Sequence, residues 1–353
     1  MDFIKVVFNL IMASLIMFIC IKFLAKFFDA STYKIVNLNR KKRNILGALV
    51  LGLTIIWPII CSGQAYILRT SVVILLYVVL ALSLNFVLGF TGQLSMGHAA
   101  FYAIGAYTVA ILTVDFKISF WIALLCAAII SAIFGFILGI PTLRLRGDYL
   151  AIVTIGFGEI VRLVLVNWID FTKGPSGIPG IPSPSIFGFQ INNNTRYYYL
   201  ILIIVFITIY ISYKLLNSRL GRGLIAIRDD EVAADAMGVN VTSLKVMAFV
   251  LGAVIAGIAG GFFASFVHYV NPDNFTYMES VTILCMVVLG GLGSIPGVIL
   301  GAVVLTLLPE ALRDVATYRY AIYGILLAMM MIMRPQGMIS MSKLKRRSSK
   351  WYY

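Results

Sequence analysis

Charged side chains are scarce in this sequence: Asp, Glu, Lys and Arg together make up 12% of its 353 residues. A soluble domain is about one quarter charged and about one half apolar, whereas this chain is 61% hydrophobic with a mean hydropathy of +0.99. A soluble fold of this length would leave much of that apolar surface in water. The composition therefore excludes a soluble domain and predicts an all-α, polytopic helical membrane protein.

Side chains that bind metals or act as nucleophiles are also few. The only histidines are His98 and His268, and no clustered set of ligands or catalytic groups accompanies them. We therefore expect no enzyme activity, no metal site and no cofactor on this chain. The cysteines lie in apolar runs without paired ligand spacing, and we interpret them as small hydrophobic residues of membrane spans: Cys20, Cys61, Cys126 and Cys285.

Acidic residues number only 14 against 28 basic ones, which gives a net charge of +14. Nucleic-acid binding is not indicated, because the basic residues gather in short loops between apolar runs, as in cytoplasmic loops of membrane proteins. With about eleven crossings, all clusters fall on one side if the N-terminus is outside and the C-terminus cytoplasmic. The clusters are 40–43, 143–146, 343–347 and the group Lys214, Arg219, Arg222 and Arg228.

About 10–11 membrane segments are expected, since a helix needs about 20 apolar residues to cross a bilayer. The first apolar run is long and lacks a small-residue cleavage site, so we do not interpret it as a secretory signal. Residues 1–65 are expected to hold membrane segments without a diagnostic motif, 66–338 the transmembrane core, and 339–353 a basic cytoplasmic tail. Candidate spans are 6–25, 45–61, 66–90, 98–114, 118–140, 149–168, 198–216, 245–268, 280–291, 296–308 and 320–333.

The ninth and tenth candidate spans, 280–291 and 296–308, are short. We expect them to form a broken or re-entrant pair. The topology also places the loop 217–244 in the cytoplasm and the Gly/Pro-rich loop 173–180 outside.

The polar stretch 221–238 predicts a short capped helix within the cytoplasmic loop. Asp229 or Asp230 is a suitable N-cap, and Glu231 stands in the first turn, where negative charge complements the helix dipole. Gly238 follows the last turn, where a left-handed C-terminal cap needs glycine.

One side of this predicted helix is apolar, while Glu231 and Asp235 are expected to point away from it. A helix of about eight to ten residues is not stable alone in water, so something must pack on that side. Lipid headgroups are one candidate, but the acidic face opposes a negative leaflet, which favours a cytoplasmic protein. The apolar residues are Val232, Ala233, Ala236 and Met237.

Several stretches together resemble the LivM-like permease subunit of the bacterial branched-chain amino-acid ABC importer, the high-affinity branched-chain amino-acid transport system permease family. The resemblance covers about 66–338, and several long matches in the right order make it more specific than one motif. The matching stretches are AIRDDEVAADAMGVN at 226–240, GFTGQLSMGHAAF at 89–101, LRLRGDYLAIVT at 143–154, VLGGLGSIPG at 288–297 and RPQG at 334–337.

The resemblance implies a multi-pass bacterial cytoplasmic membrane protein that carries ATP-driven import without hydrolysing ATP. No Gly-x-x-x-x-Gly-Lys-Ser/Thr phosphate loop occurs, so ATP-Mg would bind to partner chains. The implied partners are a second homologous permease, two cytoplasmic ATPases and an extracytoplasmic substrate-binding protein. The residues expected to couple to the ATPase are Arg228, Asp229, Asp230, Glu231, Ala233, Ala234, Ala236, Met237 and Gly238.

Two glycine clusters, 89–97 and 290–297, lie at membrane depth, although glycine costs about 1 kcal/mol in a helix interior. They fit either close helix packing or broken helices that expose backbone groups to a translocation path. Pro296 lacks a backbone donor and favours a break in the second cluster. The path candidates in these clusters are Gly92, Gln93, Ser95, Gly97, His98, Gly290, Gly291, Gly293, Ser294, Pro296 and Gly297.

Glu159 is a further path candidate, because ionisable groups inside spans usually face protein or water. Arg162 stands three residues on, so an intrahelical ion pair is an equal alternative. The loop 174–184 fits either contact with a binding protein or a plain connection.

The substrates implied by the resemblance are leucine, isoleucine and valine. Alternatives are a related ABC importer for urea or another small solute, and an ion-coupled secondary carrier that needs no ATPase.

Overall fold

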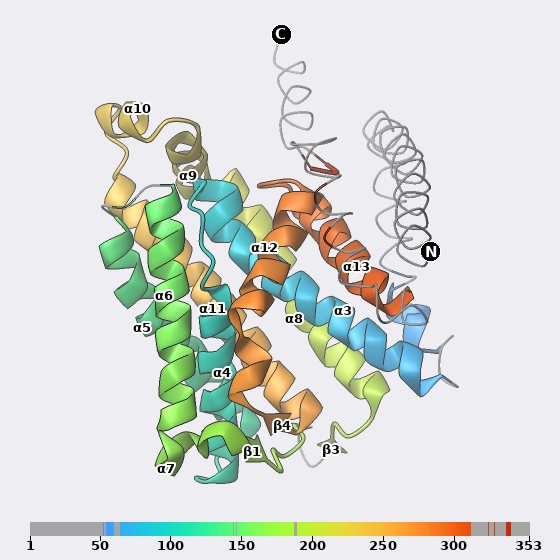
Figure 1. Cartoon of the computed structure of the whole chain (residues 1–353). Coiled ribbons are helices and arrows are strands. Elements are labelled where there is room, and N and C mark those ends of the chain that lie inside the picture. Colours follow the sequence, from blue (N-terminus) through green and yellow to red (C-terminus); the bar gives the residue numbers. More distant parts are fainter. Residues whose placement is uncertain are drawn as a thin grey trace, which may run out of the picture.

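The computed structural model describes residues 52, 54–59, 64–143, 145, 147–186, 189–311, 324, 328 and 337–339 (Figure 1). The predicted span 6–25 and most of the predicted spans 45–61 and 320–333 therefore lie outside the described residues. So do the basic clusters 40–43 and 343–347, the side chains of Arg144 and Arg146, and most of the tail.

Helices occupy most of the described chain and lie where the apolar runs predict them. The longer helices are α3 (Ala65–Leu84), α4 (His98–Val114), α5 (Phe120–Thr142), α6 (Asp148–Asn167), α8 (Asn194–Asn217), α11 (Val241–Val267), α12 (Tyr277–Gly290) and α13 (Ile295–Ala311). The shorter elements are the π-helix η1 (Asn85–Gly89), α7 (Ile169–Thr172), η2 (Gly174–Ser176), α9 (Arg219–Asp229), α10 (Glu231–Ala236), η3 (Pro272–Phe275) and four two-residue strands. Five of these helices are long and apolar enough to cross a bilayer, which confirms the polytopic helical class.

Helix α11 is the centre of the bundle and packs against α3, α4 and α5. Small residues bring its backbone close to α4, because a methyl group added to Gly105 or Gly260 would overlap a main-chain oxygen of the other helix. This is the close packing through small residues that membrane helices use in place of a hydrophobic driving force.

The two ends of the bundle carry different elements. Helices α9 and α10 lie at one end, and the strands β1 (Ile178–Pro179) and β4 (Tyr269–Val270) lie at the other (Figure 1). The strands pair antiparallel, with Ile178 opposite Val270, and a second pair joins β2 (Ser185–Ile186) to β3 (Phe189–Gln190). The 173–180 loop and the 217–244 loop are thus at opposite ends, as the topology predicts.

Two helix pairs are interrupted at the α9 end of the bundle. After η1 the chain leaves helix at Gly92 and enters α4 only at His98. Between α12 and α13, Gly291 and Gly293 adopt positive φ angles of 114° and 77°, a conformation that glycine takes without a Cβ penalty. At 14 residues α12 is about 21 Å long, too short for a hydrocarbon core of about 30 Å, so the short pair is discontinuous as predicted.

Candidate functional site

Helix α9 anchors the loop 217–244 to the bundle. The Ser218 hydroxyl caps its N-terminus by accepting a hydrogen bond from the Gly221 backbone N–H at 3.1 Å. Leu224 and Ile227 are buried beneath it, and a side chain at Gly221 would overlap the carbonyl oxygen of Leu215. The helix therefore lies tightly on the end of the bundle.

Helix α10 is capped at both ends, as its sequence predicts. Asp230 Oδ1 accepts hydrogen bonds from the backbone N–H groups of Val232 and Ala233, at 2.9 and 3.0 Å. At the other end Gly238 has φ +80°, its N–H bonds to Asp235 O, and the Val239 N–H bonds to Ala234 O, which is the Schellman arrangement. With 6 residues, α10 is shorter than expected, because 219–229 forms the separate helix α9.

The Glu231 side chain is directed away from the apolar side of α10, and it lies against the start of α11. Its carboxylate lies 2.7 Å from Nζ of Lys245 in the first turns of α11, where the Lys245 side chain is only 3% exposed. Burial of the ammonium requires a paired carboxylate, and Glu231 supplies it. Ala234 is also buried against this chain, so Glu231 and Ala234 hold α10 in place and are not free to meet a partner.

The outer side of α10 is apolar and exposed. Val232 is 64% and Met237 83% exposed, and Ala233 and Ala236 beside them are exposed as well. Large apolar groups gathered in this way mark an interaction surface. We call Val232, Ala233, Ala236 and Met237 the α10 face.

Arg228, in the last turn of α9, contacts the interrupted end of helix α3. Its Nη1 donates a hydrogen bond to the Gly89 carbonyl oxygen at 2.8 Å, and its Nη2 lies 3.8 Å from Asp229 Oδ1. Gly92, with φ +72°, lies against the Arg228 side chain, because a Cβ there would come 2.9 Å from its Cγ. The loop 217–244 thus touches the first glycine cluster directly.

The two glycine clusters meet at this end of the bundle. Asn85 Oδ1, in the π-helix, accepts a hydrogen bond from the Gly293 N–H at 3.0 Å. Gly89 lies so close to the Gly293 nitrogen that only glycine fits. The breaks are therefore at the α9 edge of the bundle, and they are packed against each other.

Residues near the end of the chain complete this junction. Gly337 lies against Gly291, where a side chain would overlap the backbone. The backbone N–H groups of Met338 and Ile339 donate to Leu289 O at 2.8 Å and Gly290 O at 3.1 Å. These bonds satisfy carbonyl groups that the end of α12 leaves unpaired.

Close packing and helix breaking are both present in the second cluster. Gly290 and Gly297 pack backbone against backbone across α12 and α13. The break itself spans Gly291 to Ser294, with the Ser294 hydroxyl accepting from the Gly297 N–H at 3.3 Å. Pro296 stands in the first turn of α13, where proline is tolerated, so the glycines make the break and Pro296 only follows it.

The non-helical segment 92–97 runs against α6. The Met96 N–H donates to Thr154 Oγ1 at 3.0 Å, and a side chain at Gly97 would overlap the Thr154 carbonyl oxygen. Gln93 and Ser95 are buried, and within the described residues Gln93 Nε2 and Ser95 Oγ have no hydrogen-bond partner. Buried polar groups are normally paired, so these two atoms distinguish the segment from ordinary packing.

His98 begins α4 and is 1% exposed. Its Nε2 lies 2.6 Å from the Ser83 hydroxyl of α3, and that hydroxyl donates to the Leu80 carbonyl. The other ring nitrogen, Nδ1, has no partner among the described residues.

Glu159 pairs with Arg162, as one of the two alternatives predicted. Arg162 Nη1 lies 3.8 Å from Glu159 Oε2, and Nη2 lies 3.2 Å from Asp273 Oδ1 in η3. The structure therefore places Glu159 in an ion-pair network with Arg162 and Asp273.

Three contacting residues were not predicted from the sequence: Asn85, Lys245 and Asp273. Each is a single polar residue at the edge of an apolar run or in a loop, and its role depends on a distant partner. Lys245 gave the clearest signal, as a lone base at the start of a predicted span. Within the described part of the chain, no group of three or more His, Cys, Asp or Glu could hold a metal ion.

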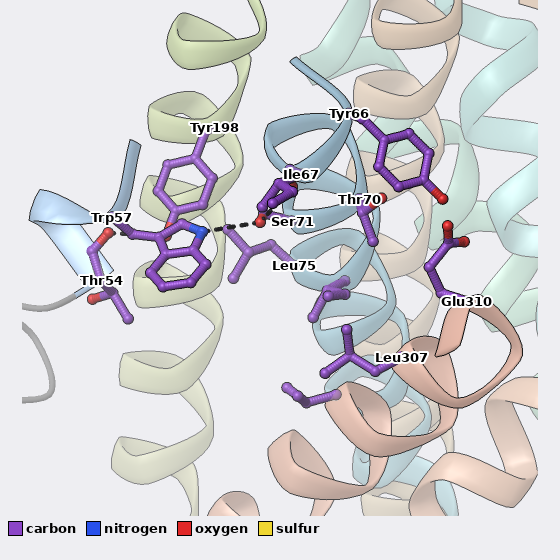
Figure 2. Close-up of a pocket in the computed structure, with 12 residues that line it drawn as sticks. Thr54, Trp57, Tyr66, Ile67, Thr70, Ser71, Leu75, Tyr198, Leu307 and Glu310 are labelled. Atoms are coloured by element: carbon purple, nitrogen blue, oxygen red, sulfur yellow. Dashed lines mark hydrogen bonds between the residues drawn. The ribbon is translucent and has the colours of Figure 1, made fainter. Parts of the chain in front are cut away.

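A cleft of about 590 Å³ lies elsewhere, between 54–57, α3, α8 and α13 (Figure 2). Trp57 Nε1 donates to Ser71 Oγ at 3.1 Å across it, and Glu310 reaches it from α13. None of the predicted path residues lines this cleft.

Comparison with known proteins gives one consistent family. The family model described as "Branched-chain amino acid transport system / permease component" matches residues 66–334. The permease protein LivM of the high-affinity branched-chain amino acid transport system of Salmonella typhimurium is 40% identical over 345 residues, covering 91% of this chain and 79% of the relative. The Escherichia coli LivM protein is 39% identical over the same shares.

The permease protein LivH of Salmonella typhimurium is a more distant relative. It is 25% identical over 296 residues, covering 76% of this chain and 93% of the relative. No solved structure matches the chain significantly.

Proposed function

The chain belongs to the branched-chain amino acid transport system permease family, and we propose that it forms part of the translocation pathway of an ATP-driven importer of leucine, isoleucine and valine. The substrates follow from its relatives LivM and LivH, which are permease proteins of a high-affinity branched-chain amino acid transport system. ATP-Mg would bind to two separate cytoplasmic ATPases. A second, homologous permease and an extracytoplasmic binding protein would complete the importer.

The observation that carries the proposal is the α10 face on a firmly held helix. The Asp230 cap, the Schellman turn at Gly238 and the Glu231–Lys245 ion pair fix α10 to the start of α11. A helix of 6 residues would not persist alone, yet its outer side exposes Val232 and Met237. The α10 face, an apolar surface on a rigidly held helix, is suited to bind in a groove on an ATPase.

Two contacts would carry ATPase motion into the membrane. Lys245 joins α10 to α11, the central helix, and Arg228 joins α9 to the break after α3. Because α11 packs on α3, α4 and α5, a shift of α10 would reach most of the bundle. Closure of the ATPase dimer would thus switch the pathway between outward-open and inward-open states.

The proposed orientation places the α9–α10 end in the cytoplasm, with the N-terminus outside and the C-terminus inside. Lys214, Arg219 and Arg222 support it, because they lie at or near the α9 end and basic residues favour the cytoplasmic side. The β1–β4 sheet then faces outward and is available to the binding protein.

Purification through a tag on this chain, followed by reconstitution with the binding protein, tests the proposal. Two ATPases and a second permease should be recovered, with leucine uptake that depends on ATP. Recovery of ATPases without uptake of leucine, isoleucine or valine would exclude these amino acids as substrates and would favour urea or another small solute. Recovery of this chain alone, transporting on an ion gradient, would overturn the proposal.

A further inference from the structure

Glu279 is a carboxylate in the membrane region to which the pathway described above assigns no role. It stands in the first turn of α12 and is partly buried. The Tyr77 side chain of α3 makes a hydrogen bond to it, and the Tyr102 ring of α4 lies near both. An ionisable residue at such a position is costly and usually serves a function.

The depth of Glu279 follows from its contact with α3. Tyr77 is the central residue of the 25-residue span Ala65–Gly89. It is therefore about 18 Å from the Gly89 end, at about 1.5 Å per residue, close to the bilayer midplane, which is about 15 Å from either edge of the hydrocarbon core.

Two discontinuous helices begin beside this carboxylate. The Ala99 N–H at the start of α4 donates to the Ser280 hydroxyl of α12 at 2.9 Å, so the two N-termini adjoin. Glu279 complements the dipole of α12, whereas α4 has no acidic residue in its first turn. The start of α4 thus retains the partial positive charge that attracts an anion.

Glu279 also lacks a basic partner. Within the described residues the ion pairs of acidic side chains involve Glu159, Asp229, Glu231 and Asp273, with Arg162, Arg228 and Lys245 as the bases. The carboxylate is therefore available to a cation that is not part of the described chain. Its chain neighbours Met278, 65% exposed, and Tyr277, 40% exposed, lie on the surface of the described bundle.

A second polar group supports a ligand at this place. The buried Ser95 hydroxyl, two residues before the N-cap of α4, has no partner among the described residues. A carboxylate at the start of α4 would give such a donor an acceptor. The aromatic rings of Tyr102 and Phe275, 4.9 Å apart, lie nearby and suit an apolar side chain.

We propose that Glu279 forms a transient subsite for a zwitterionic amino acid at the bilayer midplane. The substrate ammonium group binds the Glu279 carboxylate, and the substrate carboxylate faces the N-terminus of α4. This subsite rests on the proposed import function. It would orient the amino acid in transit, while the binding protein determines the affinity of uptake.

The test uses the complete importer in proteoliposomes, with leucine uptake and ATP hydrolysis measured together. Leucine uptake by the wild type is measured first, and it tests the proposed import function independently of the Glu279 subsite. Glu279→Gln should then lower the maximal uptake per ATP hydrolysed by ~10-fold, as expected for loss of a charged hydrogen bond. ATP hydrolysis stimulated by the binding protein should persist, and the leucine concentration for half-maximal uptake should stay constant.

Two further variants separate substrate binding from a structural role. Glu279→Asp keeps a carboxylate and should restore most of the uptake per ATP. Glu310→Gln, the same change on α13 in the cleft of Figure 2, should leave both rates near those of the wild type. Equal uptake per ATP in Glu279→Gln and the wild type would overturn the proposal, and so would equal loss of uptake, ATP hydrolysis and assembly in Glu279→Gln and Glu279→Asp.

Discussion

The guanidinium of Arg228 and the carbonyl oxygen of Gly89 are 2.8 Å apart although 139 residues separate them in the chain. Arg228 lies in the last turn of helix α9, and Gly89 ends the π-helix that extends α3. A π-helical turn inside an α-helix often marks a functional site. The contact therefore joins the surface that would meet the ATPase to the first break of the membrane core.

Replacement of Arg228 should uncouple ATP hydrolysis from transport. Arg228→Ala removes a charged hydrogen bond, a contribution of about 1.5–3 kcal/mol, so uptake per ATP should fall by ~10-fold or more. ATPase recovery should be unchanged, because the α10 face is untouched. Arg222→Ala, at an exposed position of the same helix, is the control, and equal effects of the two variants would contradict the coupling role.

An acidic residue on the α10 face should release the ATPases. Met237→Asp places a charge where Met237 is 83% exposed, so this chain should still fold and reach the membrane. A charge desolvated without a partner at an interface costs several kcal/mol, which predicts loss of the ATPases on purification. Thr242→Asp, at an exposed position in the first turn of α11, should retain them, and retention by Met237→Asp would place the docking surface elsewhere.

Loss of the Lys245 ammonium should destabilise the chain. Lys245→Met leaves the Glu231 carboxylate partly buried without its cation, a cost of about 1–3 kcal/mol, visible as a lower Tm in detergent. The double variant Glu231→Met, Lys245→Met should recover much of the loss, because replacing both charges by apolar groups is often neutral. A double variant less stable than Lys245→Met would show that the pair does not act as a unit.

Gly97→Ala should disturb the packing of α4 against α6. The added methyl group would overlap the Thr154 carbonyl oxygen, and forced overpacking costs about 1–3 kcal/mol. Gly156→Ala, in α6 with nothing within 4 Å of the added group, is the matched control and should be neutral or slightly stabilising. Thermal unfolding of the purified chain in detergent compares the two, and equal Tm values would contradict the close approach described for Gly97.

Local features of the fold were predictable from the sequence. The span 98–114 coincides with α4 because Gly97 and Asp115 bound an uninterrupted apolar run. The Asp230 cap and the Gly238 turn were predictable because each depends on residues within one helical turn.

Contacts between distant residues were not predictable in the same way. The sequence predicted only that the Glu231 side chain points away from the apolar side of its helix, and the turn between α10 and α11 brings Lys245 beneath it. The approach of Asn85 to Gly293 likewise depends on how α3 packs against α12 and α13. Periodicity and capping carry no information about such pairings, since both describe one helix at a time.

The bond between Asn85 and Gly293, 208 residues apart, constrains how the protein is made. A chain that enters the bilayer from its N-terminal side exposes the Asn85 amide oxygen long before α12 and α13 exist. Unpaired polar groups in hydrocarbon cost several kcal/mol each. The first half of the chain must therefore remain beside water, the insertion machinery or another polar helix until the second half is inserted. If the two halves were made as separate polypeptides, each would keep unpaired polar groups on the surface that meets the other half.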